Sequence, residues 1–290
     1  MRIVYHLGAH CTDEERLIRC LLKNRNLLAE QGIIVPEPAQ YRKLLRDTSV
    51  DLKGAPASED LQRQVLQQIL GEENGERVVL SWESFLSFPQ WALRGSLYGF
   101  AGERVRAFTQ IFPQYQSQFA LAIRNPATFL PALFERQKGK SYEEFFEGTD
   151  PRAIRWSDVI RQIAEQCPQT PITVWCDEES PLIWPEVLQA VSGHDDTTQL
   201  AETDELLAQL MNAEGLKRMR NYVASHPPAN SHQRRRIAAA FLEKFALPEA
   251  LTYKFDLPGW TAEMVEEMTA HYREDIQRIA DRPQVDLISA

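Results

Sequence analysis

The beginning of the chain combines a short apolar run, a glycine and an amphipathic helical pattern, in that order. The apolar run covers residues 3–7 and leads through Gly8 into a polar stretch that ends at Glu15. From Thr12 to Glu30 leucines recur at helical spacing with charged residues between them, which predicts a helix with one apolar face. A strand that passes through a tight loop into a helix brings free N–H groups together, and this layout is typical of phosphate-binding loops.

Further apolar runs resemble the first one in length and end in polar residues. The predicted strands cover residues 2–8, 77–83, 118–124 and 172–177, with a short extended segment at 33–36. Helical patterns separate them, and this alternation predicts an α/β fold with a mostly parallel sheet flanked by helices. From Asp204 onward the pattern is helical, which predicts a helical C-terminal portion. No repeat or low-complexity linker divides the chain, and we expect a single domain over residues 1–290.

Spacing and chain breaks also predict local elements. Residues 41–57 are polar and are expected to be irregular, whereas residues 205–224 are expected to form one helix. Ser231 is the expected N-cap of the helix that ends at Phe245. The last predicted helix covers residues 262–280.

The net charge and the cysteine spacing argue against several classes of binding partner and site. The net charge is −9, which argues against a broad surface for nucleic acid or for an anionic membrane. The four cysteines form no Cys-x-x-Cys pair, so neither a zinc ribbon nor a thioredoxin motif is indicated. We find no signal-peptide pattern and no apolar run long enough to span a membrane, and therefore expect a cytoplasmic protein with reduced thiols.

The loop residues His6, Gly8, His10 and Thr12 resemble the opening motif of bacterial sulfotransferases, His-x-Gly-x-His-Lys-Thr-Gly-Thr-Thr. Residues 24–36 and the last helix are also similar to that family. The resemblance implies a P-loop NTPase-like fold and the cofactor 3′-phosphoadenosine 5′-phosphosulfate (PAPS). It assigns the phosphosulfate group of PAPS to a loop that here contains Gly8, His10, Cys11 and Thr12.

A second part of the resemblance lies after the predicted strand 118–124. Arg124 and Pro126 match an Arg-x-Pro motif whose arginine binds the 3′-phosphate, but Ala132 stands at the position of the family's serine. An arginine at a strand end is a good anion ligand. A salt bridge from Arg124 to a carboxylate of residues 13–15 is the alternative.

Glu83 follows another predicted strand in the pattern Ser-x-Glu. Ligands of parallel α/β sheets bind at the carboxyl ends of strands, which places Glu83 well for a site. The resemblance implies that it is the general base for the acceptor hydroxyl. The alternative is that Glu83 caps the following turn or pairs with an arginine.

The loop departs from the sulfotransferase pattern in its charges. Cys11 replaces the lysine, and Asp13, Glu14 and Glu15 replace Gly-Thr-Thr. Carboxylates at short range oppose phosphate binding. Thr12-x-x-Glu15 is also a capping-box pattern, so we interpret the loop as one whose anion is replaced by internal carboxylates.

A metal site and a reactive cysteine have weaker support from the sequence than a phosphate-binding loop. His6 and His10 lie on a strand and a loop rather than on one helix, so we expect no metal site. Cys11 before a helix could have a lowered thiol pKa, although the adjacent carboxylates would oppose this.

Two functions remain open. In the first, the protein transfers a sulfuryl group from PAPS to a small-molecule hydroxyl acceptor, with His10 and Arg124 on the phosphates and Glu83 as base. In the second, it is a diverged, non-catalytic binding or scaffold protein. The resemblance favours the first and the loop charges favour the second. We expect weak or absent nucleotide binding.

Overall fold

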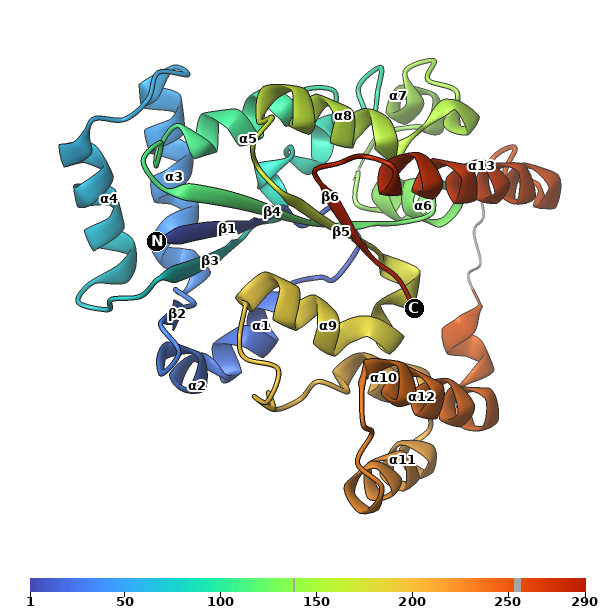
Figure 1. The fold of residues 1–290 in the computed structure, drawn as a ribbon. Coiled ribbons are helices and arrows are strands. Elements are labelled where there is room, and N and C mark those ends of the chain that lie inside the picture. The colour runs from blue at the N-terminus through green and yellow to red at the C-terminus, as the bar shows by residue number, and fades with distance from the viewer. Residues whose placement is uncertain (138, 253–256) are drawn as a thin grey trace.

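A six-stranded, all-parallel sheet forms the centre of the computed structural model, which describes residues 1–137, 139–252 and 257–290 (Figure 1). The strand order is β2-β3-β1-β4-β5-β6. The strands are β1 (Arg2–His6), β2 (Ile33–Ile34), β3 (Arg77–Ser81), β4 (Gln116–Ile123), β5 (Ile172–Cys176) and β6 (Val285–Ile288). The predicted α/β class with a mostly parallel sheet and a helical C-terminal portion is confirmed.

Helices occupy most of the remaining chain. They are α1 (Arg16–Lys23), α2 (Arg25–Ala29), α3 (Pro38–Leu52), α4 (Glu59–Leu70), α5 (Ala101–Thr109), α6 (Pro126–Glu135), α7 (Tyr142–Phe146), α8 (Trp156–Gln166), α9 (Ser180–Ser192), α10 (Glu205–Leu210), α11 (Ala213–Ser225), α12 (Ser231–Phe245) and α13 (Ala262–Ala280). Within the described ranges, no helix has both the length and the apolar character needed to cross a membrane.

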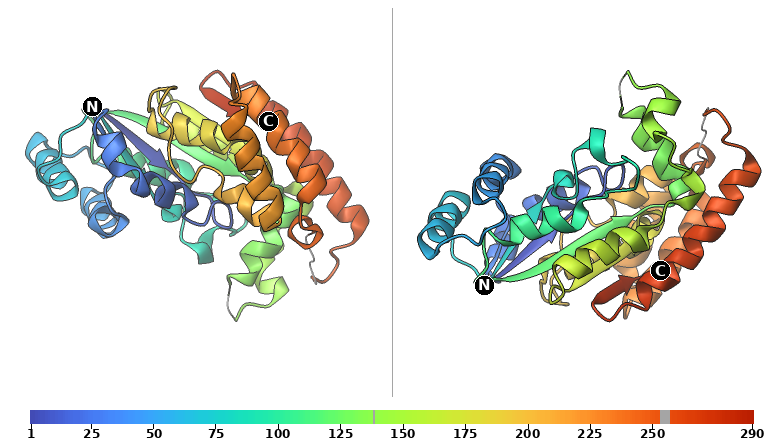
Figure 2. Two further views of the ribbon diagram at one scale, coloured as in Figure 1. Left: turned by 90° about the horizontal axis from the view of Figure 1, so that it is seen from below. Right: turned by 90° about the horizontal axis from the view of Figure 1, so that it is seen from above.

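Both faces of the sheet are covered because successive side chains of a strand point to opposite sides. Ile3 and Tyr5 of β1 belong to the core on one face, and Val4 belongs to the core on the other. Helices α5, α8, α6 and α13 lie above the sheet in Figure 1, and α1 and α9 lie below it. Seen from above, α8 lies between α5 and α13 (Figure 2). Helices α10, α11 and α12 pack around a separate small core below α9.

At β1 and its neighbour β4, the chain connections go to opposite faces of the sheet. β1 pairs with β3 on one side and with β4 on the other. After β1 the chain turns to α1 on the lower face, whereas after β4 it turns to α6 on the upper face. In α/β proteins, ligands bind at the carboxyl ends of the strands where the connections diverge in this way.

Two predicted segments differ from the structure for local reasons. Residues 41–57 are not irregular throughout: α3 begins at Pro38 and buries Tyr41, Leu45 and Thr48 about one turn apart. The first predicted helix is broken at Asn24, whose amide oxygen accepts the N–H of Ala201 at 2.8 Å.

The remaining differences concern caps and the edge of the sheet. Asn212 separates α10 from α11 because its side chain accepts the N–H of Gly215 at 2.8 Å. Asn230, not Ser231, is the N-cap of α12 and accepts the N–H of Gln233 at 2.9 Å. The short strand β6 was not predicted. It pairs with β5, far from it in sequence, and its four residues, three half-buried and one exposed, carry little pattern.

Candidate functional site

The loop between β1 and α1 lies at the carboxyl end of β1, and its second residue must be a glycine. Gly8 has φ +52°, in the left-handed region. A Cβ atom at this position would lie 3.2 Å from the Cα and from the backbone nitrogen of Glu83. The loops that follow β1 and β3 therefore touch through their backbones at Gly8.

Three residues of the loop other than glycine are also left-handed. Cys11, Glu14 and Glu15 have φ values of 60°, 49° and 66°. Each such residue costs about 1 kcal/mol or more, and such strain clusters at functional sites. The backbone of the loop is therefore held in a shape that its side chains alone would not select.

The backbone of the loop keeps several hydrogen-bond donors available. Among the residues that the structure describes, no acceptor meets the N–H groups of residues 8, 9 and 11–15. Clustered N–H groups of this kind form anion-binding concavities. This feature supports the interpretation of the segment as a phosphate loop.

His10 is completely buried and bonded to Tyr98. The Tyr98 hydroxyl oxygen accepts the backbone N–H of His10 at 3.1 Å and lies 2.8 Å from its Nδ1. Burial, with a smaller effect from Arg136, lowers the pKa of His10 to about 4. The imidazole is therefore neutral near pH 7 and adds no positive charge for a phosphate group.

The predicted capping box between Thr12 and Glu15 is wrong. The Thr12 hydroxyl donates to the carbonyl oxygen of Ala9 at 2.6 Å, and Glu15 makes no side-chain cap. Instead, the carboxylate of Asp13 accepts the N–H of Leu17 at 3.0 Å. An internal carboxylate does occupy the start of α1, but it comes from Asp13.

Cys11 contributes its carbonyl group rather than its thiol. Arg124, at the end of β4, donates from Nη1 to the carbonyl oxygen of Cys11 at 2.6 Å. Burial raises the pKa of the Cys11 thiol to about 11, and Glu14 acts in the same direction, as expected of the adjacent carboxylates. Helix α1 begins only at Arg16, so the thiol does not lie at its N-terminus.

Arg124 contacts a side-chain hydroxyl and a backbone carbonyl group. Its Nε donates to the hydroxyl of Thr128 at 3.0 Å, and its Nη1 donates to the carbonyl oxygen of Cys11. The indole N–H of Trp156 donates to the carbonyl oxygen of Arg124 at 2.7 Å and fixes its backbone. Arg124 thereby ties β4, α6 and the loop together.

The loop carboxylates pair with other arginines. Arg136, just after α6, contacts Glu14 at 3.3 Å and Glu83 at 3.2 Å. Arg42 of α3 contacts Glu15 at 2.6 Å. Glu83 is thus paired with an arginine, as the alternative interpretation proposed. Sequence reasoning missed Arg42 and Arg136, because neither lies next to a strand end.

A cavity of about 280 Å³ adjoins the other side of Tyr98. Its walls include the exposed Trp91 and Phe100 and the guanidinium-bearing Arg104. Tyr98 is buried and also lines the cavity.

Two acidic residues follow the end of β5, near Arg124 and the loop. Burial and the neighbouring Glu178 raise the pKa of Asp177 from 3.8 to about 7, and Arg124 acts in the opposite direction. Glu178 accepts the backbone N–H of Asn125 at 2.7 Å. A carboxyl group whose pKa lies near neutrality is typical of functional sites, although structural networks produce it as well.

Asp177→Asn is expected to change the dependence of stability on pH. The folded protein keeps a proton on Asp177 up to about pH 7, whereas an ordinary aspartate loses it near pH 3.8. The folded state thus binds more protons across this window, and the contribution of Asp177 to stability falls as the pH rises through it. Burial lowers the pKa values of His6 and His10, so their contributions to stability rise with pH instead of falling.

The measurement is the difference in unfolding free energy between wild type and Asp177→Asn at pH 4.5 and pH 7.5. Asp177 is only partly screened from water, so we expect a change on the order of 1–2 kcal/mol in that difference. Asp158→Asn, on the surface of α8, is the control and should leave the profile unchanged. Identical profiles for wild type and Asp177→Asn would contradict the assignment.

Comparison with protein-family models, with curated proteins and with solved structures gives no match to this chain. Within the part of the chain that the structure describes, His, Cys, Asp and Glu side chains form no group of three or more able to hold a metal ion. The functional argument therefore depends on the loop and its arginines.

Proposed function

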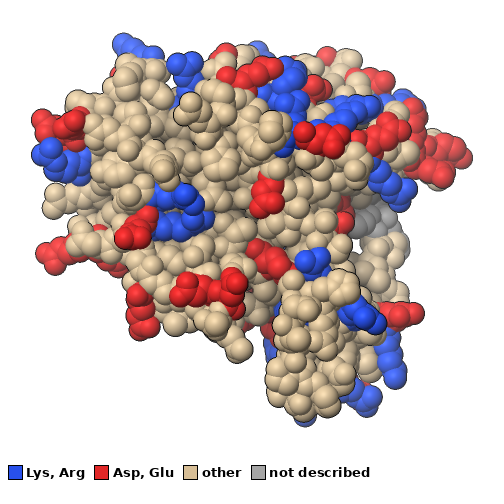
Figure 3. All heavy atoms as spheres, viewed as in Figure 1, with Lys and Arg blue, Asp and Glu red and all other residues tan. Residues whose placement is uncertain are grey.

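We propose that this chain is a diverged, sulfotransferase-like protein that acts in binding or as a scaffold and does not transfer a sulfuryl group from PAPS. The proposal combines the resemblance of the loop with the charges around it. It includes a cytoplasmic location, which is supported by four free and buried cysteines. It includes no nucleic-acid partner. On the face seen in Figure 3, basic and acidic side chains are interspersed.

The observation that carries the proposal is the pairing of arginines with carboxylates around the loop. A phosphosulfate group would need cationic partners, but Arg136 and Arg42 contact Glu14, Glu83 and Glu15. Asp13 occupies the start of α1, where an anion would bind. An incoming phosphate would have to displace these carboxylates and would be repelled by them.

The candidate catalytic residues are also engaged. Glu83 would need to reach an acceptor hydroxyl, but its carboxylate contacts the guanidinium group of Arg136 at 3.2 Å. His10 is neutral and bonded to Tyr98. These contacts support a structural role for both residues.

Sulfuryl transfer is the second candidate, and one observation favours it. The open N–H groups of residues 8, 9 and 11–15 are suited to bind an anion and to stabilise developing charge. In that case the loop residues Gly8, His10, Cys11 and Thr12 would hold the phosphosulfate group and Arg124 the 3′-phosphate. The cavity beside Tyr98 would receive the hydroxyl acceptor.

Calorimetric titration with 3′-phosphoadenosine 5′-phosphate, the desulfated product of PAPS, separates the two candidates. We expect no saturable heat and no thermal shift with wild-type protein at millimolar ligand. The companion variants are Arg124→Ala, at the predicted phosphate ligand, and Arg161→Ala, whose arginine lies on the exposed surface of α8 and pairs with Asp158.

Micromolar binding that is lost in Arg124→Ala and retained in Arg161→Ala would overturn the proposal and support a working sulfotransferase. Circular dichroism of Arg124→Ala is needed alongside, because Arg124 also holds the carbonyl group of Cys11. Binding that is unchanged in both variants would place the nucleotide elsewhere and leave the loop without a cofactor.

A further inference from the structure

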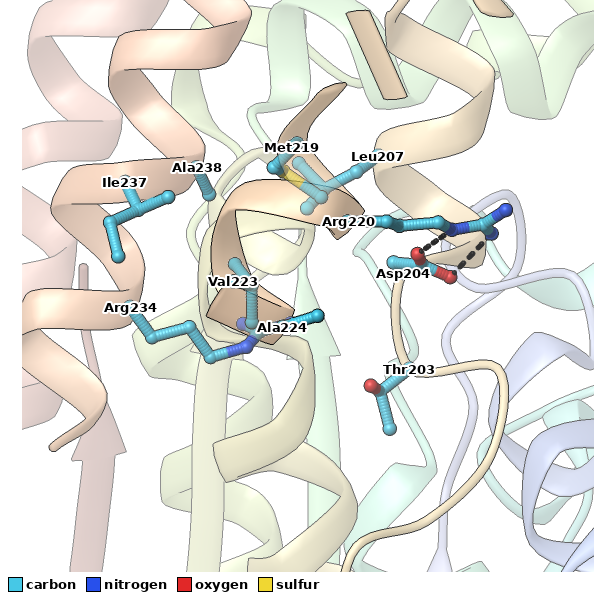
Figure 4. Close-up of a pocket in the computed structure, with 10 residues that line it drawn as sticks. All are labelled: Thr203, Asp204, Leu207, Met219, Arg220, Val223, Ala224, Arg234, Ile237 and Ala238. Carbon is cyan, nitrogen blue, oxygen red and sulfur yellow. Dashed lines mark hydrogen bonds and ion pairs between the residues drawn. The ribbon is translucent and has the colours of Figure 1, made fainter. Parts of the chain in front are cut away.

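A second candidate site lies among α10, α11 and α12, away from the loop. It is a cavity of about 250 Å³ (Figure 4). Its apolar walls come from all three helices and consist of Leu207, Met219, Val223, Ile237 and Ala238. Thr203, Asp204, Arg220 and Arg234 add polar groups to the lining. Mostly apolar walls with few polar groups are typical of small-molecule sites.

Arg234 brings a buried charge to this cavity. In Figure 4 its side chain extends from α12 toward Val223 and Ala224 of α11. Its Nη1 atom is buried, and no acceptor for it is found in the described ranges of the chain. A buried guanidinium nitrogen without an acceptor costs free energy, which an anionic group in the cavity would recover.

The charged groups around Arg234 determine which net charge a ligand in the cavity should carry. Arg220 forms two bonds to the carboxylate of Asp204, at 2.6 Å and 3.0 Å. Arg235 contacts Glu186 at 3.0 Å, and the carboxylates of both Asp204 and Glu186 also act on Arg234. The lining itself holds the guanidinium groups of Arg220 and Arg234 and the carboxylate of Asp204, which leaves one positive charge. A single negative charge balances this set, whereas a phosphate dianion would exceed it.

We infer that this cavity binds a small monocarboxylate with an apolar chain, whose carboxylate pairs with Arg234 and whose chain packs against the walls from α10, α11 and α12. Guanidinium groups pair well with carboxylates because their N–H groups match the two oxygens. The proposed site is independent of the loop and of PAPS.

Octanoate is the probe that tests the inference, and octanamide is its neutral analogue. The full chain carries ¹³C-labelled methionine methyl groups, and the titration is followed by NMR and calorimetry. Among the five methionines, only Met219 lines the cavity. We expect a saturable shift of the Met219 signal with octanoate, no shift of Met1, Met264 or Met268, and binding of octanamide that is weaker by about tenfold or more.

Arg234→Met keeps an apolar side chain and removes the charge. It is expected to weaken octanoate binding by about tenfold or more, and the loss of a buried unpaired charge should not destabilise the fold. Arg236→Met makes the same charge change at an exposed position of α12 and is the matched control. Val223→Phe keeps Arg234 but fills the cavity and should also weaken binding.

The inference is overturned if octanoate does not bind, if Arg234→Met binds it as well as Arg236→Met does, or if octanamide binds equally well. It is also overturned if the Met219 signal stays fixed while heat is released. None of these outcomes depends on nucleotide binding at the loop, so the two proposals can fail separately.

Discussion

Gly8→Ala is expected to destabilise the protein by about 2–4 kcal/mol, a large part of the stability of an ordinary domain. Two effects add at this position. Alanine at φ +52° is strained, and its Cβ atom would lie 3.2 Å from backbone atoms of Glu83. The atoms met are backbone atoms, and the N–H of the preceding Trp82 donates to the carbonyl oxygen of His6 at 3.1 Å, so the contact cannot be relieved by moving a flexible side chain. Urea unfolding followed by circular dichroism measures the effect.

Gly54→Ala is the matched control. Gly54 has φ +84°, and no atom lies within 4 Å of the position of a Cβ. It should show only the conformational cost, about 1 kcal/mol. Equal effects of the two substitutions would mean that the loops after β1 and β3 are not in close contact at Gly8.

Trp156→Ala is expected to cost about 3–5 kcal/mol. The Trp156 side chain is fully buried, packs edge-to-face on Phe129 with centroids 5.2 Å apart, and donates to the carbonyl oxygen of Arg124. The substitution leaves a cavity and removes the donor that this carbonyl group uses. Thermal unfolding, with urea titration for the free energy, gives the measurement.

Two further substitutions separate the contribution of the hydrogen bond from the contribution of burial. Trp156→Phe keeps most of the ring volume but removes the N–H donor, and a loss of about 1–2 kcal/mol is expected for the hydrogen bond and the remaining gap. Trp91→Ala removes an indole that is 51% exposed and should cost about 1 kcal/mol or less. A cost for Trp91→Ala that equals the cost for Trp156→Ala would contradict the burial assigned to the two rings.

The sheet could be predicted because its strands are short apolar runs bounded by polar residues. The strands near residues 2–8, 77–83, 118–124 and 172–177 are present, and their ends lie within two residues of those expected. Strand β6 and helix α3 could not be predicted in the same way. Strand β6 has only four residues, three half-buried and one exposed, and the apolar face of α3 is narrow among its many charged side chains.

The position of the site could be predicted, but its contacts could not. The rule that loops gather at the carboxyl ends of parallel strands brings Gly8, Arg124 and Glu83 to one edge. The partners of the carboxylates depend on tertiary packing, since Arg136 and Arg42 reach the loop from α6 and α3. The Tyr98–His10 contact joins residues far apart in sequence, and no spacing rule indicates it.

The position of β1 in the middle of the sheet has a consequence for folding during synthesis on the ribosome. Ile3 pairs with Val78 on one side and with Ser117 on the other. At synthesis rates of about 5–20 residues per second, the second neighbour is made on the order of ten seconds after β1. Until β3 has been made, β1 has both edges unpaired, and until β4 follows it has one. Such a strand is an aggregation hazard, so early protection by a chaperone matters more for this topology than for one whose first strand lies at an edge.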